Sequence, residues 1–137
     1  MAKGPSVTQN DVKGPRVLIV DDEPALREII EQEFARKGWL TCMAGGGYEA
    51  FEILQTTSVE VVVSDVRMSK GSGIQLLDLI SADPVIKPIV ILISGYSEVD
   101  EYKAMKKGAA AFFLKPFRMK DFVDSVILIY QQARESA

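Results

Sequence analysis

Residues 16–24 read RVLIVDDEP, an apolar run that ends in two aspartates and is followed by a proline. An unbroken apolar run of this kind is typical of a strand that helices cover on both faces. Pro24 has a fixed φ that suits the first turn of a helix. The stretch therefore predicts a buried strand, a short acidic loop and then a helix.

The same order of strand and helix repeats along the chain. Helices are expected from Pro24 to Gly38, after Gly47, and over 74–80, 98–107 and 120–132. We expect strands at 17–20, 40–44, 59–64, 89–93 and 111–114. This alternation indicates an α/β fold of successive βα units around a five-stranded parallel sheet with helices on both faces. We interpret the sheet as doubly wound and flavodoxin-like, a kind of fold in which the strand order is 2-1-3-4-5.

Two of the expected helices carry apolar patterns that can be tested. The first places Leu26, Ile29, Ile30 and Phe34 on one stripe. The helix at 120–132 holds more apolar residues than one core stripe can use, so part of its surface is expected to meet a partner.

The composition indicates one domain. The chain has 137 residues, 47% of them hydrophobic and 26% charged, and no apolar run approaches the ~18 residues of a membrane span. A net charge of −3 does not favour direct nucleic-acid binding by this segment, although a DNA-binding domain could be a partner. Residues 1–15 are expected to be a flexible lead-in, 16–133 the domain and 134–137 a C-terminal tail.

Two residue counts narrow the chemistry. The chain has no histidine, which excludes His metal sites, Ser-His triads and phosphotransfer through a histidine of its own. The single cysteine, Cys42, lies in an apolar segment and is expected to be a small buried hydrophobe. Because no internal disulfide can form and no apolar signal core follows the N-terminus, we expect a cytoplasmic location.

Polar side chains follow four of the expected strands. Asp21 and Asp22 follow the first strand, Asp65 the third, Ser94 the fourth and Lys115 the fifth. In an open α/β sheet, ligands bind beyond the carboxyl ends of the strands, where the strand order reverses. Each residue taken alone could be a helix cap or a turn former. Together they predict a polar site at one edge of the sheet.

The three aspartates at this edge would repel one another unless cations were present. Oxygen ligands without nearby His or Cys suit a hard ion, and Mg²⁺ is commonly held by carboxylates, waters and phosphate oxygens. The Lys115 ammonium would add a second positive charge. Such a site can hold a phosphoryl group in transfer, and a carboxylate can be the nucleophile that forms an aspartyl phosphate.

The motifs together resemble the receiver domain of bacterial two-component response regulators, the CheY-like superfamily, over nearly all of residues 16–133. The motifs that carry the resemblance are Val20-Asp21-Asp22-Glu23-Pro24, the junction at 44–50, Asp65-Val66-Arg67-Met68 with Gly73 further on, Ser94-Gly95 and Lys115-Pro116-Phe117. Any one of them is weak, but their order and spacing are specific.

The resemblance implies a role for each motif residue. Asp65 would accept a phosphoryl group from the phosphohistidine of a sensor histidine kinase or a phosphotransfer protein. Mg²⁺, with Mn²⁺ as an alternative, would be held by Asp22, Asp65 and the Arg67 backbone carbonyl, while Asp21 would act largely through water. Lys115 would pair with Asp65 at rest and with a phosphoryl oxygen afterwards. The Lys115–Pro116 bond would be cis and would aim Lys115 into the site.

The resemblance also implies how the signal would leave. The Ser94 hydroxyl would move to the phosphoryl group, and Phe112 would be the switch aromatic that turns inward. The surface of the fourth helix, fifth strand and fifth helix would then change, so that it controls an effector domain or pairs with a second copy. Arg67, Met68 and Tyr96 would flank the phosphoryl group. The protein would be a signalling phosphoacceptor that promotes only its own phosphorylation and dephosphorylation.

Two departures and two alternatives accompany this interpretation. Ser69 stands where the family usually has proline, and the stretch 95–107 is slightly short. A Mg²⁺-dependent phosphatase with an aspartate nucleophile, of the haloacid dehalogenase type, would need Asp-x-Asp after the first strand, where this chain has Asp21-Asp22-Glu23. A pseudo-receiver that binds partners without phosphorylation would lack a key residue, and none is missing from the sequence.

Overall fold

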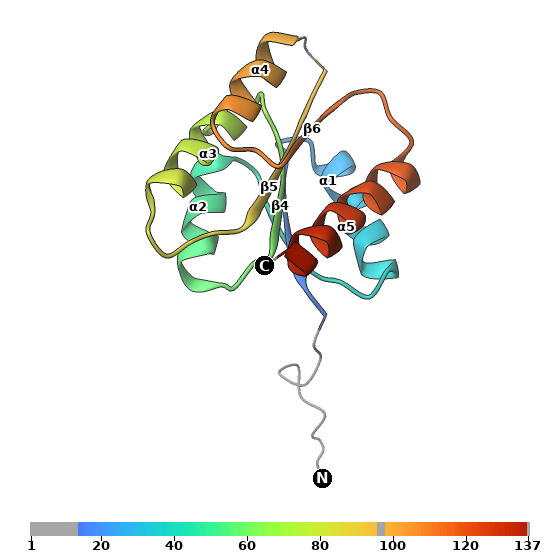
Figure 1. Ribbon diagram of the computed structural model, residues 1–137. Coiled ribbons are helices and arrows are strands. Elements are labelled where there is room, and N and C mark those ends of the chain that lie inside the picture. The colour runs from blue at the N-terminus through green and yellow to red at the C-terminus, as the bar shows by residue number, and fades with distance from the viewer. Residues whose placement is uncertain (1–13, 96–97, 137) are drawn as a thin grey trace.

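The structure, a computed structural model, describes residues 14–95 and 98–136. Within these residues, five parallel strands form one sheet in the order β3-β2-β4-β5-β6 through the centre of the molecule (Figure 1). The strands are β2 (Arg16–Val20), β3 (Leu40–Ala44), β4 (Val61–Asp65), β5 (Ile89–Ser94) and β6 (Ala111–Leu114). Counted along the chain this order is 2-1-3-4-5, so the predicted fold class is confirmed.

Helices cover both faces of the sheet. Helices α1 and α5 pack together on one face, and α2, α3 and α4 lie in sequence on the other (Figure 1). No helix in the described part of the chain is long and apolar enough to cross a membrane. The helices are α1 (Pro24–Arg36), α2 (Gly47–Thr56), α3 (Gly73–Ala82), α4 (Glu98–Lys106) and α5 (Met119–Ser136).

The interior strand β2 shows why the strands are apolar throughout. Val17 and Ile19 lie in a buried cluster with side chains of α1 and α5. Leu18 and Val20 point the other way and lie in a second cluster with side chains of α2 and α3. Because both faces of the strand are buried, polar groups can be placed only beyond its ends.

The start of β4 differs from the prediction. The strand begins at Val61 rather than at 59, and its regular pairing with β2 starts where Val61 lies opposite Val17. Glu60 instead turns its carboxylate back to accept a hydrogen bond from the backbone N–H of Arg16 at 2.7 Å. The two residues before Val61 therefore lie at the amino end of β4 and are not part of the strand.

The inner stripe of α1 is narrower than the sequence predicts. Ile30 and Phe34 are buried and Leu26 is partly buried, but Ile29 is 49% exposed. Successive helical residues are rotated by about 100°, so Ile29 lies beside the stripe that Ile30 defines. After α1, Gly38 takes a left-handed φ of 86° and ends the helix, as predicted.

Helix α5 is longer and better covered than the sequence predicts. It runs to Ser136, through most of the expected tail at 134–137, and residues 133–136 include no glycine or proline that would end it earlier. Tyr130 packs edge to face on Trp39, with ring centroids 5.1 Å apart. Among the large apolar residues at 122–130, only Leu128 is more than half exposed, at 53%. The expected surplus of apolar surface is thus limited to Leu128 and its partly exposed neighbours.

Candidate functional site

The candidate site lies at the carboxyl ends of four neighbouring strands. Strand β2 ends just before Asp21, β4 ends at Asp65, β5 ends at Ser94, and Lys115 directly follows β6. These strands are parallel neighbours, so their carboxyl ends meet at one edge of the sheet. The structure therefore brings together the polar residues that the sequence predicts to share a site.

Asp65 and Lys115 form an ion pair. The Nζ atom of Lys115 donates a hydrogen bond to Oδ2 of Asp65 at 3.0 Å. Burial lowers the pKa of Lys115, but its hydrogen bond to Asp65 and the charges of Asp65 and Asp21 raise the pKa by more, so the net shift is upward and favours the ammonium form. The Lys115–Pro116 peptide bond is cis, as predicted.

Asp21 is buried, with only 1% of its surface exposed. Its Oδ1 accepts a hydrogen bond from the backbone N–H of Glu23 at 2.8 Å. Its Oδ2 is buried and accepts no hydrogen bond from the described residues. Burial raises the pKa of Asp21 to about 6, with the hydrogen bond from Glu23 opposing the shift and the charge of Asp65 adding to it. A cation beside the unpaired oxygen would relieve this cost.

Asp22 lies differently from its neighbour. It is exposed, and its Oδ2 accepts a hydrogen bond from the backbone N–H of Ser69 at 3.3 Å. Ser69 stands where the resemblance to receiver domains would imply a proline, and a proline has no N–H to donate. The serine therefore adds a hydrogen bond between two loops of the site.

The carboxylates only partly form a cation site. Among the described residues, no group of three or more Asp, Glu, Cys or His side chains is placed to hold a metal ion. Asp21 and Asp65 are close enough for the charge of Asp65 to raise the pKa of Asp21, and Oδ2 of Asp21 is unpaired. The unpaired oxygen of Asp21 thus suits a hard cation, whereas Asp22 would have to turn away from Ser69 to join it.

Asp100 belongs to the site, although no motif in the sequence points to it. It lies buried in the first turn of α4, and its Oδ2 accepts a hydrogen bond from the Ser94 hydroxyl at 3.0 Å. Its Oδ1 accepts a hydrogen bond from Nη2 of Arg67 at 3.3 Å. Ala104, four residues further on, is also buried and shares the inner face of the helix.

Arg67 and Met68 follow Asp65 in the loop after β4. The backbone N–H of Arg67 donates to Oδ1 of Asp65 at 3.3 Å, and Met68 packs half-buried against the core below α2 and α3. Both line a cleft with a volume of about 540 Å³. Tyr96, the third predicted flanking residue, lies outside the described residues. The cleft is lined by Asp22, Val66, Arg67, Met68, Ser69, Ser72, Ile74, Asp100 and Lys103.

Phe112 and Phe113 of β6 face opposite layers. Phe112 is half-buried in the cluster that contains Ala104 of α4. Phe113 faces α5 and packs edge to face on Phe122, with ring centroids 5.0 Å apart. Of the two rings, Phe112 therefore lies in the layer of α4.

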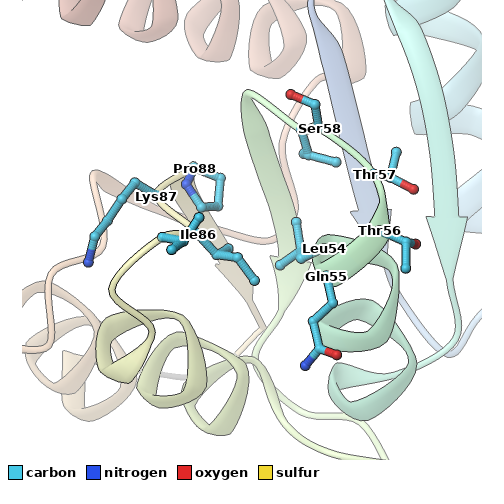
Figure 2. Close-up of a pocket in the computed structure, with 10 residues that line it drawn as sticks. Leu54, Gln55, Thr56, Thr57, Ser58, Ile86, Lys87 and Pro88 are labelled. Carbon is cyan, nitrogen blue, oxygen red and sulfur yellow. The ribbon is translucent and has the colours of Figure 1, made fainter.

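A separate cleft lies at the other end of the sheet. It has a volume of about 290 Å³ and lies between the end of α2 and the loop before β5, where Figure 2 shows Leu54 and Pro88. Its lining residues, at 54–59 and 85–88, precede β4 and β5, so they lie at the amino ends of these strands, opposite Asp65. No predicted site residue lines it.

Comparison with known proteins assigns the class. The sequence profile of the response regulator receiver domain matches residues 17–127. The chain therefore belongs to the response regulator receiver domain family, the signalling domains of two-component systems. This agrees with the fold and with the edge at which the polar residues gather.

Two relatives and one solved structure illustrate the similarity. The chain is 31% identical over 134 residues to the transcriptional regulatory protein PdtaR of Mycobacterium tuberculosis, covering 96% of this chain and 64% of that protein. It is 29% identical over 119 residues to the transcriptional regulatory protein TrcR of the same organism, covering 87% and 46%. The chain thus spans less than two thirds of either relative. The receiver domain of the Francisella response regulator 1452 aligns with a TM-score of 0.80 and 28% identity, covering 88% of this chain and 99% of that one.

Proposed function

We propose that Asp65 accepts a phosphoryl group. The proposal is carried by the ion pair between Asp65 and Lys115, at 3.0 Å, beside the unpaired Oδ2 of Asp21. A carboxylate nucleophile is thereby held between an ammonium group and a place for a cation. Because residues 1–137 contain no histidine, the phosphohistidine donor would lie outside this segment, on a sensor histidine kinase or a phosphotransfer protein.

The transfer needs charge neutralisation more than it needs a base. An oxygen of Asp65 attacks phosphorus, a P–O bond forms, and the bond from phosphorus to the donor's imidazole nitrogen breaks with its electron pair going to that nitrogen. Asp65 reacts as a carboxylate, so no proton has to be removed from it. The ammonium group of Lys115 then exchanges Asp65 for an oxygen of the phosphoryl group.

The residues that would hold a cation are Asp21, Asp22, Asp65 and the backbone carbonyl of Arg67. A divalent ion, Mg²⁺ or Mn²⁺, would supply positive charge to the phosphoryl oxygens during transfer. The unpaired oxygen of Asp21 and its charge coupling to Asp65 support this assignment. Asp22 would leave the Ser69 N–H when the ion binds.

The signal would leave through α4, β6 and α5. Among the described side chains of α4, only Asp100 and Ala104 are buried, so few of these side chains anchor the helix. The Ser94 hydroxyl and the Phe112 ring would carry the change from Asp65 to α4. The exposed apolar side chains of this surface, which would meet an effector domain or a second copy of the chain, are Tyr102, Met105, Leu114 and Leu128.

Intact-mass measurement tests the proposal. After treatment with acetyl phosphate and Mg²⁺, wild type should gain the mass of one phosphoryl group, and Asp65→Asn should gain none. Asp121→Asn, which removes an exposed acid from α5, serves as the matched control and should behave as wild type. A gain in Asp65→Asn would place the acceptor elsewhere. No gain in any variant, with acetyl phosphate or with a histidine kinase, would support a pseudo-receiver.

A further inference from the structure

One carboxylate joins the ends of two strands to helix α4. Oδ2 of Asp100 accepts from the hydroxyl of Ser94, the last residue of β5, and Oδ1 pairs with the guanidinium of Arg67, in the loop after β4. The Asp100 side chain is 6% exposed, and Ser94 is completely buried. Both oxygens of a buried acid are thus occupied, one by each strand end.

The Ser94 hydroxyl cannot serve two acceptors at once. A serine hydroxyl has a single proton to donate. In this structure the proton is directed at Asp100. If Asp65 carries a phosphoryl group, a hydrogen bond from Ser94 to that group requires the hydroxyl to leave Asp100. The two acceptors therefore compete for the same donor.

We propose that Asp100 is a positioning residue that holds Ser94 in the unphosphorylated arrangement and resists phosphorylation of Asp65. The inference rests on the proposed function. Loss of the Ser94 hydrogen bond leaves a carboxylate oxygen buried without that donor, which is costly and favours movement of the first turn of α4. Asp100 therefore opposes phosphorylation of Asp65. When phosphorylation occurs, the loss of the Ser94 hydrogen bond passes the change to helix α4.

The small number of buried side chains on α4 gives Asp100 its influence on that helix. Ala104 is the other buried residue among the described side chains, and its methyl group contributes little contact area. A charge-assisted hydrogen bond to a buried partner is about twice as strong as a neutral one. Among the described side chains of α4, Asp100 therefore makes the main buried polar contact, and phosphorylation of Asp65 would remove one of its two bonds.

Binding of beryllofluoride, a phosphoryl mimic, tests this inference. Its affinity in the presence of Mg²⁺ can be measured by ¹⁹F NMR for wild type, Asp100→Ala and Glu101→Ala. Glu101 is the matched control, since it is the adjacent acid on α4 and is exposed. Asp100→Ala should bind about five- to tenfold more tightly than wild type, where tenfold corresponds to about 1.4 kcal/mol. Glu101→Ala should stay within about twofold of wild type.

The sign of the effect separates positioning from a general structural role. If Asp100 only supports the fold, its removal should weaken binding, so an unchanged or weaker affinity overturns the inference. The gain in beryllofluoride affinity should also require the Ser94 hydroxyl. The affinities of Ser94→Ala and Ser94→Ala/Asp100→Ala should therefore differ by less than about twofold. A gain that persists without the hydroxyl would mean that Asp100 acts through its charge, which also contradicts the inference.

Two further measurements keep the test decisive. If Asp100→Ala does not fold, Asp100→Asn keeps the shape but weakens the acceptor, and it should give a smaller gain of about two- to fivefold. Amide hydrogen exchange without beryllofluoride should be faster over 98–106 in the Asp100 variant than in Glu101→Ala. Failure of the proposed function can be told apart from failure of this inference. In that case wild type would bind no beryllofluoride, or would bind it as tightly as Asp65→Asn does.

Discussion

Gly73, the first residue of α3, lies directly against the backbone carbonyl of Asp65. A Cβ atom at position 73 would overlap that carbonyl oxygen and would lie 3.1 Å from Cα of Val66. The N–H of Gly73 also donates to the carbonyl of Val66 at 2.9 Å. The backbone of Asp65, the proposed phosphoacceptor, is therefore positioned by the start of the following helix.

The first prediction concerns this contact. Gly73→Ala should lower the free energy of unfolding by about 1–3 kcal/mol, because the new methyl group must displace the chain at Asp65. Urea unfolding measures the loss. Gly45→Ala is the control, since a Cβ there meets its nearest neighbours at an ordinary 3.5 Å. Equal losses in the two variants would show that the contact with Asp65 is not the cause.

The second prediction concerns Lys115. Lys115→Ala should slow phosphorylation by acetyl phosphate about 100-fold, which is the effect of removing one preorganised donor from a developing negative charge. The initial rate of mass gain measures the change. Lys120→Ala, on the exposed side of α5, should react at the rate of wild type. A Lys115 variant that reacts as fast as the Lys120 variant would remove Lys115 from the proposed chemistry.

The third prediction follows from the pKa of Asp21, which is raised from 3.8 to about 6 in the folded protein. The folded state therefore holds this proton more tightly than the unfolded state. The resulting stability is fully present below about pH 4 and is lost as the pH rises through about 6. In metal-free buffer, Asp21→Asn should gain stability relative to wild type over this range, by about 1–3 kcal/mol.

Urea unfolding at the two ends of this pH range, in the presence of a chelator, measures the difference. Glu28→Gln removes an exposed acid from α1. Its stability relative to wild type should not increase as the pH rises over this range. Addition of Mg²⁺ above pH 7 should then reduce the difference in stability between Asp21→Asn and wild type, because only wild type keeps the Asp21 carboxylate for the ion. A gap that does not depend on pH would mean that Asp21 is not held with a raised pKa.

The fourth prediction concerns α5. Phe122 is 2% exposed and stacks on Phe117, with ring centroids 4.5 Å apart. Phe122→Ala should cost about 3–5 kcal/mol of stability. Leu128→Ala, on the exposed side of the same helix, should cost less than about 1 kcal/mol, because little apolar surface leaves contact there. Similar costs at both positions would contradict the assignment of the buried face.

The agreement between sequence and structure is greatest where a local pattern determines the outcome. The apolar runs locate five strands, and Pro24 and Gly38 bound α1, because proline and left-handed glycine act through their own backbone geometry. The agreement is weaker at Ile29 and Leu128, which are apolar but exposed. Periodicity shows that a helix has an apolar face, whereas the width of that face depends on which neighbour covers it.

The sequence by itself determined the order of strands and helices and the residues at the strand ends, since parallel strands place their carboxyl ends on one edge whatever their side chains contact. Only the tertiary structure decided the pairings at that edge. It showed that Lys115 binds Asp65, that Ser69 donates to Asp22, and that Asp100 binds the Ser94 hydroxyl. A hydrogen bond depends on distance and direction in three dimensions, and residues from separate loops and helices acquire both only when the chain folds.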